Sequence, residues 1–215
     1  VDFQEVEKFI STLPFDLTDD QLKSVNDIYN DLVSPKRMNR LLQGDVGSGK
    51  TIVSFIGLYI NYLAGYQGAL MVPTEILALQ HYNNIKKLFP NLRVALLTGK
   101  LKAKERREIL CDIKEGNIDV VIGTHALISD DVIYKNLGLV ITDEQHRFGV
   151  NQRSNLKNKG ITPDILYMSA TPIPRTYALT LYGDMDISSI RTMPSGRKPV
   201  KTILKSDTEI KDVLY

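Results

Sequence analysis

A glycine-rich segment of this 215-residue chain combines a lysine and a hydroxyl at a spacing suited to binding phosphate. Gly44-Asp45-Val46-Gly47-Ser48-Gly49-Lys50-Thr51 fits the pattern G-x-x-x-x-G-K-[ST] at every fixed position. Glycines let backbone N–H groups converge on phosphate oxygens, and a following helix adds its positive N-terminal end. The pattern predicts that Lys50 contacts the β- and γ-phosphates of a nucleotide and that the Thr51 hydroxyl ligates Mg²⁺. An accidental glycine-rich turn is the structural alternative.

A second reactive segment, Asp143-Glu144-Gln145-His146, closes the apolar run Leu137-Gly138-Leu139-Val140-Ile141, which predicts a buried parallel strand. Two acids and a histidine at the open end of such a strand are poorly explained by packing. Beside a phosphate loop, Asp143 is expected to hold Mg²⁺, directly or through water, and Glu144 to polarise the attacking water. The structural alternative is an acidic strand end that caps a neighbouring helix.

The elements that must position these segments alternate between strand and helix. Strands are predicted at Met38–Gln43, Ala69–Val72, Arg93–Leu97, Asp119–Ile122, Leu139–Thr142, Ile165–Met168 and Val200–Leu204. Helices are predicted at Val1–Leu13, Thr18–Leu32, Thr51–Leu63, Glu75–Phe89 and Lys102–Lys114, with a short one at His125–Ile128. This order predicts an α/β fold whose parallel sheet carries helices on both faces and binds ligands beyond the carboxyl ends of its strands. Both reactive segments and Ser169-Ala170-Thr171 fall at such ends.

Several polar residues have a structural and a functional interpretation. Thr18 and Gln21 fit a capping box, whereas Gln21 is equally suited to contact an adenine edge. Thr74, Thr98-Gly99 and Thr124-His125 follow predicted strands, where local rules favour caps and turns over contacts to a nucleic-acid backbone. The basic segment Lys100–Arg107 is by default a solvated helix face, with phosphate contact as the alternative.

Composition excludes little. The net charge is +2, so charge neither demands nor excludes a nucleic-acid partner. Cys111 is the only cysteine, which rules out an intrachain disulfide, fits a reducing cytoplasm, and predicts a small core residue. The longest apolar stretch, around Ile52–Leu63, is too short and polar to span a bilayer. No secretory signal is visible, and the first residue, Val1, suggests a piece of a longer protein.

Three strings carry a resemblance: the phosphate loop, Asp-Glu-Gln-His-Arg-Phe-Gly-Val at 143–150, and Ser-Ala-Thr-Pro-Ile-Pro-Arg-Thr at 169–176. They resemble the motor of superfamily 2 DNA helicases, and more narrowly the RecG family, which remodels stalled replication forks and Holliday junctions. The resemblance implies a RecA-like P-loop NTPase lobe that uses ATP and Mg²⁺. It implies nucleotide contacts from Phe15 and Gln21 and coupling roles for Gln145, His146, Ser169 and Thr171. It also implies DNA contacts from Thr74, Glu75, Thr98, Gly99, Thr124 and His125.

The resemblance also implies a larger parent protein. Residues 1–193 would form the first motor lobe, with residues 1–13 as a helix leading in from an upstream wedge domain. Residues 194–215 would be a linker and the start of a second lobe, which would supply the arginine that reaches the γ-phosphate. Forked or branched DNA is the implied partner. The Mfd-type translocase, a close relative, is the alternative, although its acidic segment more often reads Asp-Glu-Glu-His. A different P-loop enzyme and an inactive interaction module are broader alternatives, and the guanine motif Asn-Lys-x-Asp is absent.

Overall fold

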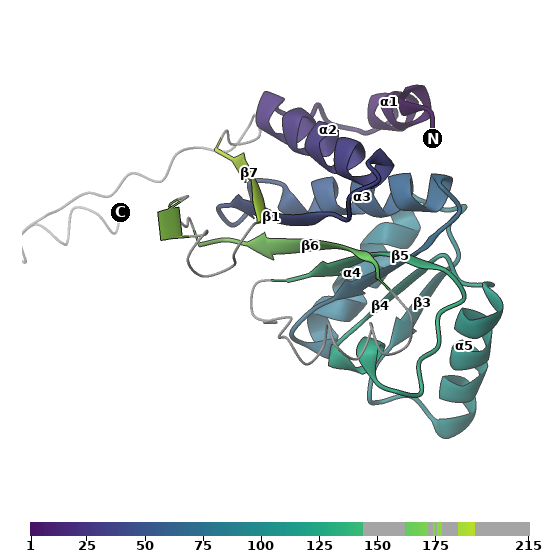
Figure 1. The fold of residues 1–215 in the computed structure, drawn as a ribbon. Coiled ribbons are helices and arrows are strands. Elements are labelled where there is room, and N and C mark those ends of the chain that lie inside the picture. Colours follow the sequence, from purple (N-terminus) through teal and green to yellow (C-terminus); the bar gives the residue numbers. More distant parts are fainter. Residues whose placement is uncertain (144–161, 172–173, 175, 178–184, 192–215) are drawn as a thin grey trace, which may run out of the picture.

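The computed structural model describes residues 1–143, 162–171, 174, 176–177 and 185–191 (Figure 1). Its strands are β1 (Asn39–Gly44), β2 (Gln67–Met71), β3 (Val94–Leu97), β4 (Val120–Gly123), β5 (Leu137–Thr142), β6 (Asp164–Ser169) and β7 (Asp186–Ile190). Its helices are α1 (Phe3–Ser11), α2 (Asp19–Val33), α3 (Lys50–Leu63), α4 (Glu75–Leu88), α5 (Ala103–Glu115) and the 3₁₀ helix η1 (His125–Ile128). The strands form one sheet in the order β3-β4-β2-β5-β6-β1-β7, and every pairing is parallel.

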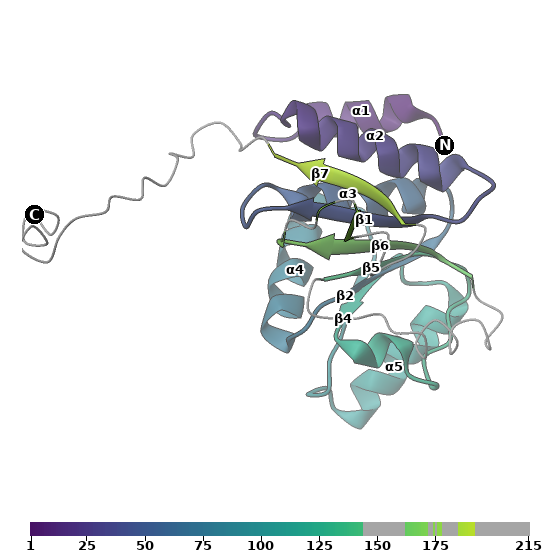
Figure 2. The same cartoon turned by 60° about the vertical axis from the view of Figure 1, so that its left-hand side comes forward.

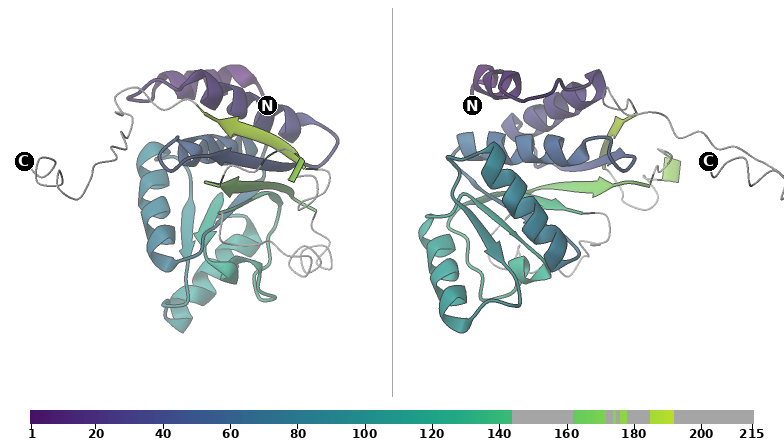
Figure 3. Two further views of the ribbon diagram at one scale, coloured as in Figure 1. Left: turned by 90° about the vertical axis from the view of Figure 1, so that its left-hand side faces the viewer. Right: turned by 180° about the vertical axis from the view of Figure 1, so that it is seen from behind.

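Helices cover both faces of this sheet (Figures 2 and 3). One core joins β1, β2, β4, β5 and β6 to the apolar faces of α2, α3 and α4. The other core, on the opposite face, includes Ile113 of α5 and Leu127 of η1. Alternate residues of a strand point to opposite faces, which is why Leu42 belongs to the first core and Leu41 to the second. The predicted α/β fold with helices on both faces is therefore confirmed.

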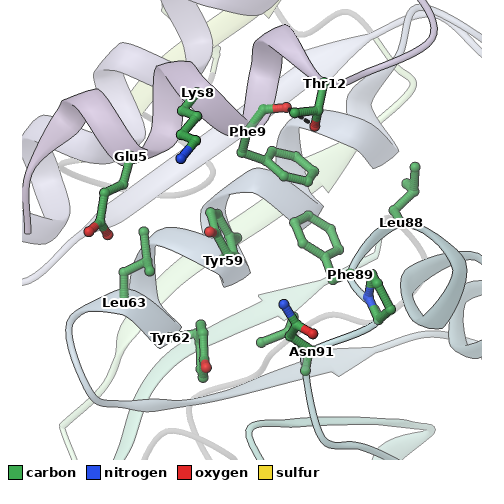
Figure 4. Close-up of a pocket in the computed structure, with 12 residues that line it drawn as sticks. Glu5, Lys8, Phe9, Thr12, Tyr59, Tyr62, Leu63, Leu88, Phe89 and Asn91 are labelled. Carbon is green, nitrogen blue, oxygen red and sulfur yellow. Dashed lines mark hydrogen bonds between the residues drawn. The ribbon is translucent and has the colours of Figure 1, made fainter.

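Helix α1 is held on the outside of α2 and α3 by aromatic rings. Phe9 stacks on Phe89, with ring centroids 4.4 Å apart, and lies 5.0 Å from the Tyr59 ring. Figure 4 shows these rings around a cavity at the C-terminal ends of α3 and α4. The cavity has a volume of 540 Å³. Each aromatic pair contributes about 0.5–1.5 kcal/mol beyond its buried area. These contacts make α1 part of the packed lobe.

The strand β7 was not predicted from the sequence, because its serines do not form an apolar run. Ser188 is buried and its hydroxyl donates to Asp27, at 2.8 Å, while accepting from Arg40 at 3.0 Å. Arg40 also pairs with Asp31 at 2.7 Å. Burial alone would lower the pKa of Arg40, but the hydrogen bond and charge of Asp31, together with the charges of Asp27 and Asp186, raise it overall. At this edge of the sheet, partly buried polar partners thus add to the apolar packing of Ile187 and Ile190.

The remaining predicted elements are present, with ends shifted by a few residues, apart from a strand expected at 200–204, which lies outside the described residues. The prediction of a buried Cys111 is wrong, because its side chain is exposed. Cys111 lies two residues from both Ile109 and Ile113, and such residues point roughly 200° apart around a helix. Because Ile109 and Ile113 face the core, Cys111 faces solvent. None of the helices in the described ranges combines the length and apolar character needed to cross a bilayer.

Candidate nucleotide site and nucleic-acid surface

The sheet order brings the predicted nucleotide residues to neighbouring strand ends. Strand β6 lies between β5 and β1, and Ser169 is in register with Gln43, directly before the phosphate loop. On its other side, Tyr167 is in register with Thr142, which precedes Asp143. Asp143, Ser169 and the loop therefore lie at the carboxyl ends of three adjacent strands, although they are far apart in sequence. Glu144, Gln145 and His146 lie outside the described residues.

The phosphate loop is a compact turn that opens α3. Gly47 and Gly49 have φ values of 78° and 91°, a left-handed conformation that glycine adopts without strain. The Ser48 N–H donates to the Asp45 carbonyl at 2.9 Å. The Lys50 ammonium donates to the carbonyl of Gly44, and to that of Asp45 at 3.2 Å. A flexible, positively charged group thus lies at the mouth of the loop, beside the positive end of α3.

Gln21 ties the start of α2 to this loop. Its side chain accepts from the Thr18 N–H at 2.8 Å, while the Gln21 N–H donates to the Thr18 hydroxyl, so the predicted capping box is present. Its amide also donates to the Ser48 carbonyl at 2.9 Å, a contact that the sequence did not predict. Gln21 is only 3% exposed. Gln21 therefore connects a helix cap with the phosphate loop, and its contact to adenine stays a prediction.

A buried hydroxyl group in the phosphate loop also suits a phosphate ligand. The Ser48 hydroxyl is buried and has no hydrogen-bond partner in the described part of the chain. Leaving a buried hydroxyl unpaired costs about 1–3 kcal/mol, so such groups tend to mark functional positions. Together with the left-handed glycines, Lys50 and the helix start, this hydroxyl makes a binding site for a nucleotide phosphate chemically reasonable.

Two cavities flank the phosphate loop. A cavity of 470 Å³ is lined by Phe15, Lys50 and Thr51, with Asn84 and Lys87 contributed by α4. Phe15 is 47% exposed, which leaves its ring available to a flat ligand such as a base. The other cavity, of 390 Å³, lies between the loop and Ala170. Beside Ala170, the Thr171 N–H donates to the Ser169 hydroxyl at 3.1 Å, which closes a tight turn.

The predicted DNA contacts gather on the other half of the sheet edge, after β2, β4 and β3. Thr74 caps α4 by accepting from the Leu77 N–H at 3.2 Å, as the structural interpretation predicts. Thr98 and Thr124 are only 8% and 9% exposed, and His125 begins η1. Thr74, Gly99 and His125 are exposed, whereas Thr98 and Thr124 are buried, and direct DNA contact stays a prediction.

The basic segment Lys100–Arg107 is partly neutralised. Arg106 pairs with Asp131 at 2.7 Å, and Lys100 with Glu75 at 3.4 Å. The hydrogen bond from Ser129, followed by that from Arg106, lowers the pKa of Asp131. The Glu75 carboxylate also accepts from the Gly99 N–H at 3.0 Å. No local pattern signals this bond, because it joins residues on different strand ends.

Comparison with known proteins assigns this arrangement to a family. The sequence profile of the DEAD/DEAH box helicase family matches residues 18–180. The chain therefore belongs to the DEAD/DEAH box helicase family. Within it, the chain is 60% identical over 202 residues to the ATP-dependent DNA helicase RecG of Staphylococcus epidermidis, and 58% identical to RecG of Staphylococcus aureus. These alignments cover 94% of the chain but about 30% of the relatives, so the chain spans less than a third of their length.

Solved structures agree with this assignment. A structure of RecG bound to a three-way DNA junction matches 99% of the chain with a TM-score of 0.87 and 51% identity, and the chain covers 29% of that protein. The DEAD-box helicase Mss116, bound to single-stranded RNA, matches 89% of the chain with a TM-score of 0.66 and 17% identity. The chain covers 44% of it, and this second likeness supports the fold alone. The predicted resemblance to the RecG motor lobe is confirmed, and the Mfd-type alternative is not favoured.

Proposed function

We propose that this chain is the first motor lobe of an ATP-dependent DNA helicase of the RecG type, which remodels stalled forks and Holliday junctions. The observation that carries the proposal is the alignment of the phosphate loop, Ser169 and Asp143 at adjacent strand ends of a chain 60% identical to RecG. Because its proposed partner is bacterial DNA, the protein would act in the cytoplasm.

The nucleotide half of the sheet edge would bind ATP through the phosphate loop. Lys50 would leave the carbonyls of Gly44 and Asp45 and turn its ammonium toward the β- and γ-phosphates. Thr51 and Asp143 would hold Mg²⁺, which neutralises phosphate charge when it is bound. Phe15 and Gln21 would contact the base. Glu144 would orient the attacking water and accept its proton.

Coupling to DNA would run along the same edge. Ser169 and Thr171 lie between the two nucleotide segments and would respond to the state of the γ-phosphate. Gln145 and His146 would pass that response to a second motor lobe. Thr74, Thr98, Gly99, Thr124 and His125 would face the DNA backbone, where N–H groups suit phosphate oxygens.

The rest of the motor would come from a parent protein of the relatives' length. A second RecA-like lobe would contribute an arginine to the γ-phosphate, and an upstream wedge domain would hold the branched DNA. An arginine supplied from another domain contributes about 10³–10⁵ in rate in related phosphoryl-transfer enzymes. We therefore expect slow hydrolysis by residues 1–215 alone.

The test is ATP and GTP hydrolysis by the parent protein, with forked DNA, linear duplex or no DNA. We expect Mg²⁺-dependent hydrolysis that prefers ATP and rises most with forked DNA. A preference for GTP would favour a different P-loop enzyme. No hydrolysis with any DNA would favour an inactive interaction module.

A further inference from the structure

A carboxylate joins two of the turns on the nucleic-acid half of the sheet edge. Glu75 is the first residue of α4, after β2, and Gly99 follows β3. Because β4 lies between these strands, Glu75 reaches across the end of β4 to accept from the Gly99 N–H at 3.0 Å. Its second oxygen lies 3.4 Å from the Lys100 ammonium. The Glu75 side chain therefore contacts both the Gly99 turn and the Lys100 ammonium.

Strand β4, which lies between β2 and β3, also contacts both of these strands closely at its end. The Val72 N–H donates to the Gly123 carbonyl at 2.9 Å, which joins the ends of β2 and β4. A Cβ at Gly123 would lie 2.2 Å from the Leu97 carbonyl oxygen, so β3 approaches β4 as closely as glycine allows. The contact from Glu75 to Gly99 adds a third link. The three turns are thereby joined to one another.

A carboxylate such as Glu75 is better suited to holding these turns in place than to binding DNA directly. An ionised carboxylate only accepts hydrogen bonds and repels a phosphate, so it is a poor DNA ligand. In the first turn of α4 its charge is stabilised by the helix dipole. Its side chain is 31% exposed, against 84% for Lys100, so it lies behind the cation. Lys100 faces solvent, where a phosphate can approach it.

We propose that Glu75 is a positioning residue for DNA, rather than a DNA contact. It holds the Gly99 turn and Lys100 in place, so that both are preorganised for a phosphate. This inference rests on the proposed function, because it assigns a support to the DNA half of the same edge. A preorganised site binds more tightly because less ordering is required on binding.

Three variants of the parent protein separate this role from simple electrostatics. Glu75→Ala removes both contacts, Glu75→Gln keeps a carbonyl acceptor for Gly99, and Glu108→Ala removes a carboxylate from α5 as a charge control. Loss of negative charge alone strengthens binding to DNA. Positioning predicts the opposite sign for Glu75→Ala, with substantial rescue in Glu75→Gln.

The first measurement is the concentration of forked DNA that half-saturates ATP hydrolysis. We expect it to rise about three- to tenfold in Glu75→Ala, as for loss of a charge-assisted hydrogen bond, with the maximal rate retained. Glu75→Gln should stay within about twofold of the wild type, and Glu108→Ala should not raise it. An unchanged or lower value in Glu75→Ala would overturn the proposal.

The second measurement is hydrogen exchange of the peptide containing Gly99 in the same variants without DNA. Its amide should exchange faster in Glu75→Ala than in the wild type, and near the wild-type rate in Glu75→Gln. Equal exchange in all variants would overturn the positioning role. If the wild type shows no stimulation by DNA, the proposed function fails instead, and this exchange measurement still reports on the bond itself.

Discussion

The backbone N–H of Asp143 donates a hydrogen bond to the Met71 carbonyl, at 3.0 Å. Asp143 follows β5, and Met71 ends β2, its neighbour in the sheet. On the sheet edge, the predicted nucleotide residues lie at the ends of β5 and of the strands beyond it, β6 and β1. The predicted DNA residues follow β2 and the strands on its other side, β4 and β3. The bond therefore lies on the boundary between the two halves of the sheet edge. If Asp143 holds Mg²⁺ as proposed, a shift of its backbone would reach the turn before Thr74 through the Met71 carbonyl.

Gln21 provides a test of how the phosphate loop is held. Gln21→Glu can still accept from the Thr18 N–H but cannot donate to the Ser48 carbonyl, and it adds a negative charge near the loop. We expect ATP to bind at least about tenfold more weakly, because a buried carbonyl is left unpaired. Fluorescent nucleotide titration measures this change.

The matched control is Asp2→Ala, which removes the cap of α1. It should cost about 0.5–2 kcal/mol of stability without weakening ATP binding. Binding of ATP to Gln21→Glu at wild-type affinity would show that the contact to Ser48 has no role in holding the loop.

The left-handed glycine at the start of α3 gives a second prediction. At Gly49 a Cβ would lie 1.9 Å from the Gln21 amide nitrogen, whereas at Gly65, with a similar φ of 88°, it would meet nothing within 4 Å. Both Gly49→Ala and Gly65→Ala should lose about 1–2 kcal/mol to backbone strain. Only Gly49→Ala should also displace Gln21 and abolish nucleotide binding. Calorimetry and nucleotide titration separate the two effects, and equal ATP affinity in both variants would contradict the steric explanation.

A third prediction concerns the start of β6. Burial raises the pKa of Asp164, although the hydrogen bond from the Met38 N–H, at 2.6 Å, partly offsets this effect. The folded protein therefore keeps the proton when the unfolded chain has lost it, and stability falls as pH rises from about 4 through the raised pKa. Urea unfolding from pH 4 to 8 should show this fall in the wild type and a smaller one in Asp164→Asn. Identical pH profiles would argue against it.

Features that depend on residues close together in the sequence could be predicted from it, whereas features that depend on distant residues could not. The turn before α3 and the helix caps depend on neighbouring residues, so the sequence predicts the turn that ends at Gly49 and the caps at Thr18 and Thr74. The apolar runs of the inner strands predict a parallel sheet for the same reason. Strand β7 depends on Asp27 and Arg40, more than a hundred residues away, so its serines gave no local signal.

The site shows the same limit. The contact from Gln21 to Ser48 joins the start of α2 to the phosphate loop, and that from Glu75 to Gly99 joins two separate strand ends. Only the folded chain brings these residues together. The roles of Glu144, Gln145 and His146 stay predictions, because these residues lie outside the described ranges. Their assignment rests on the sequence and on the family to which the chain belongs.

The most direct test of the proposed motor is ATP binding and DNA-stimulated hydrolysis by the parent protein carrying Glu144→Gln. The amide keeps the size of the side chain but cannot accept a proton from the attacking water. The account predicts ATP affinity close to that of the wild type, with stimulation by forked DNA lost. Wild-type hydrolysis by this variant, in the presence of forked DNA, would contradict the role of Glu144 and the catalytic site built around it.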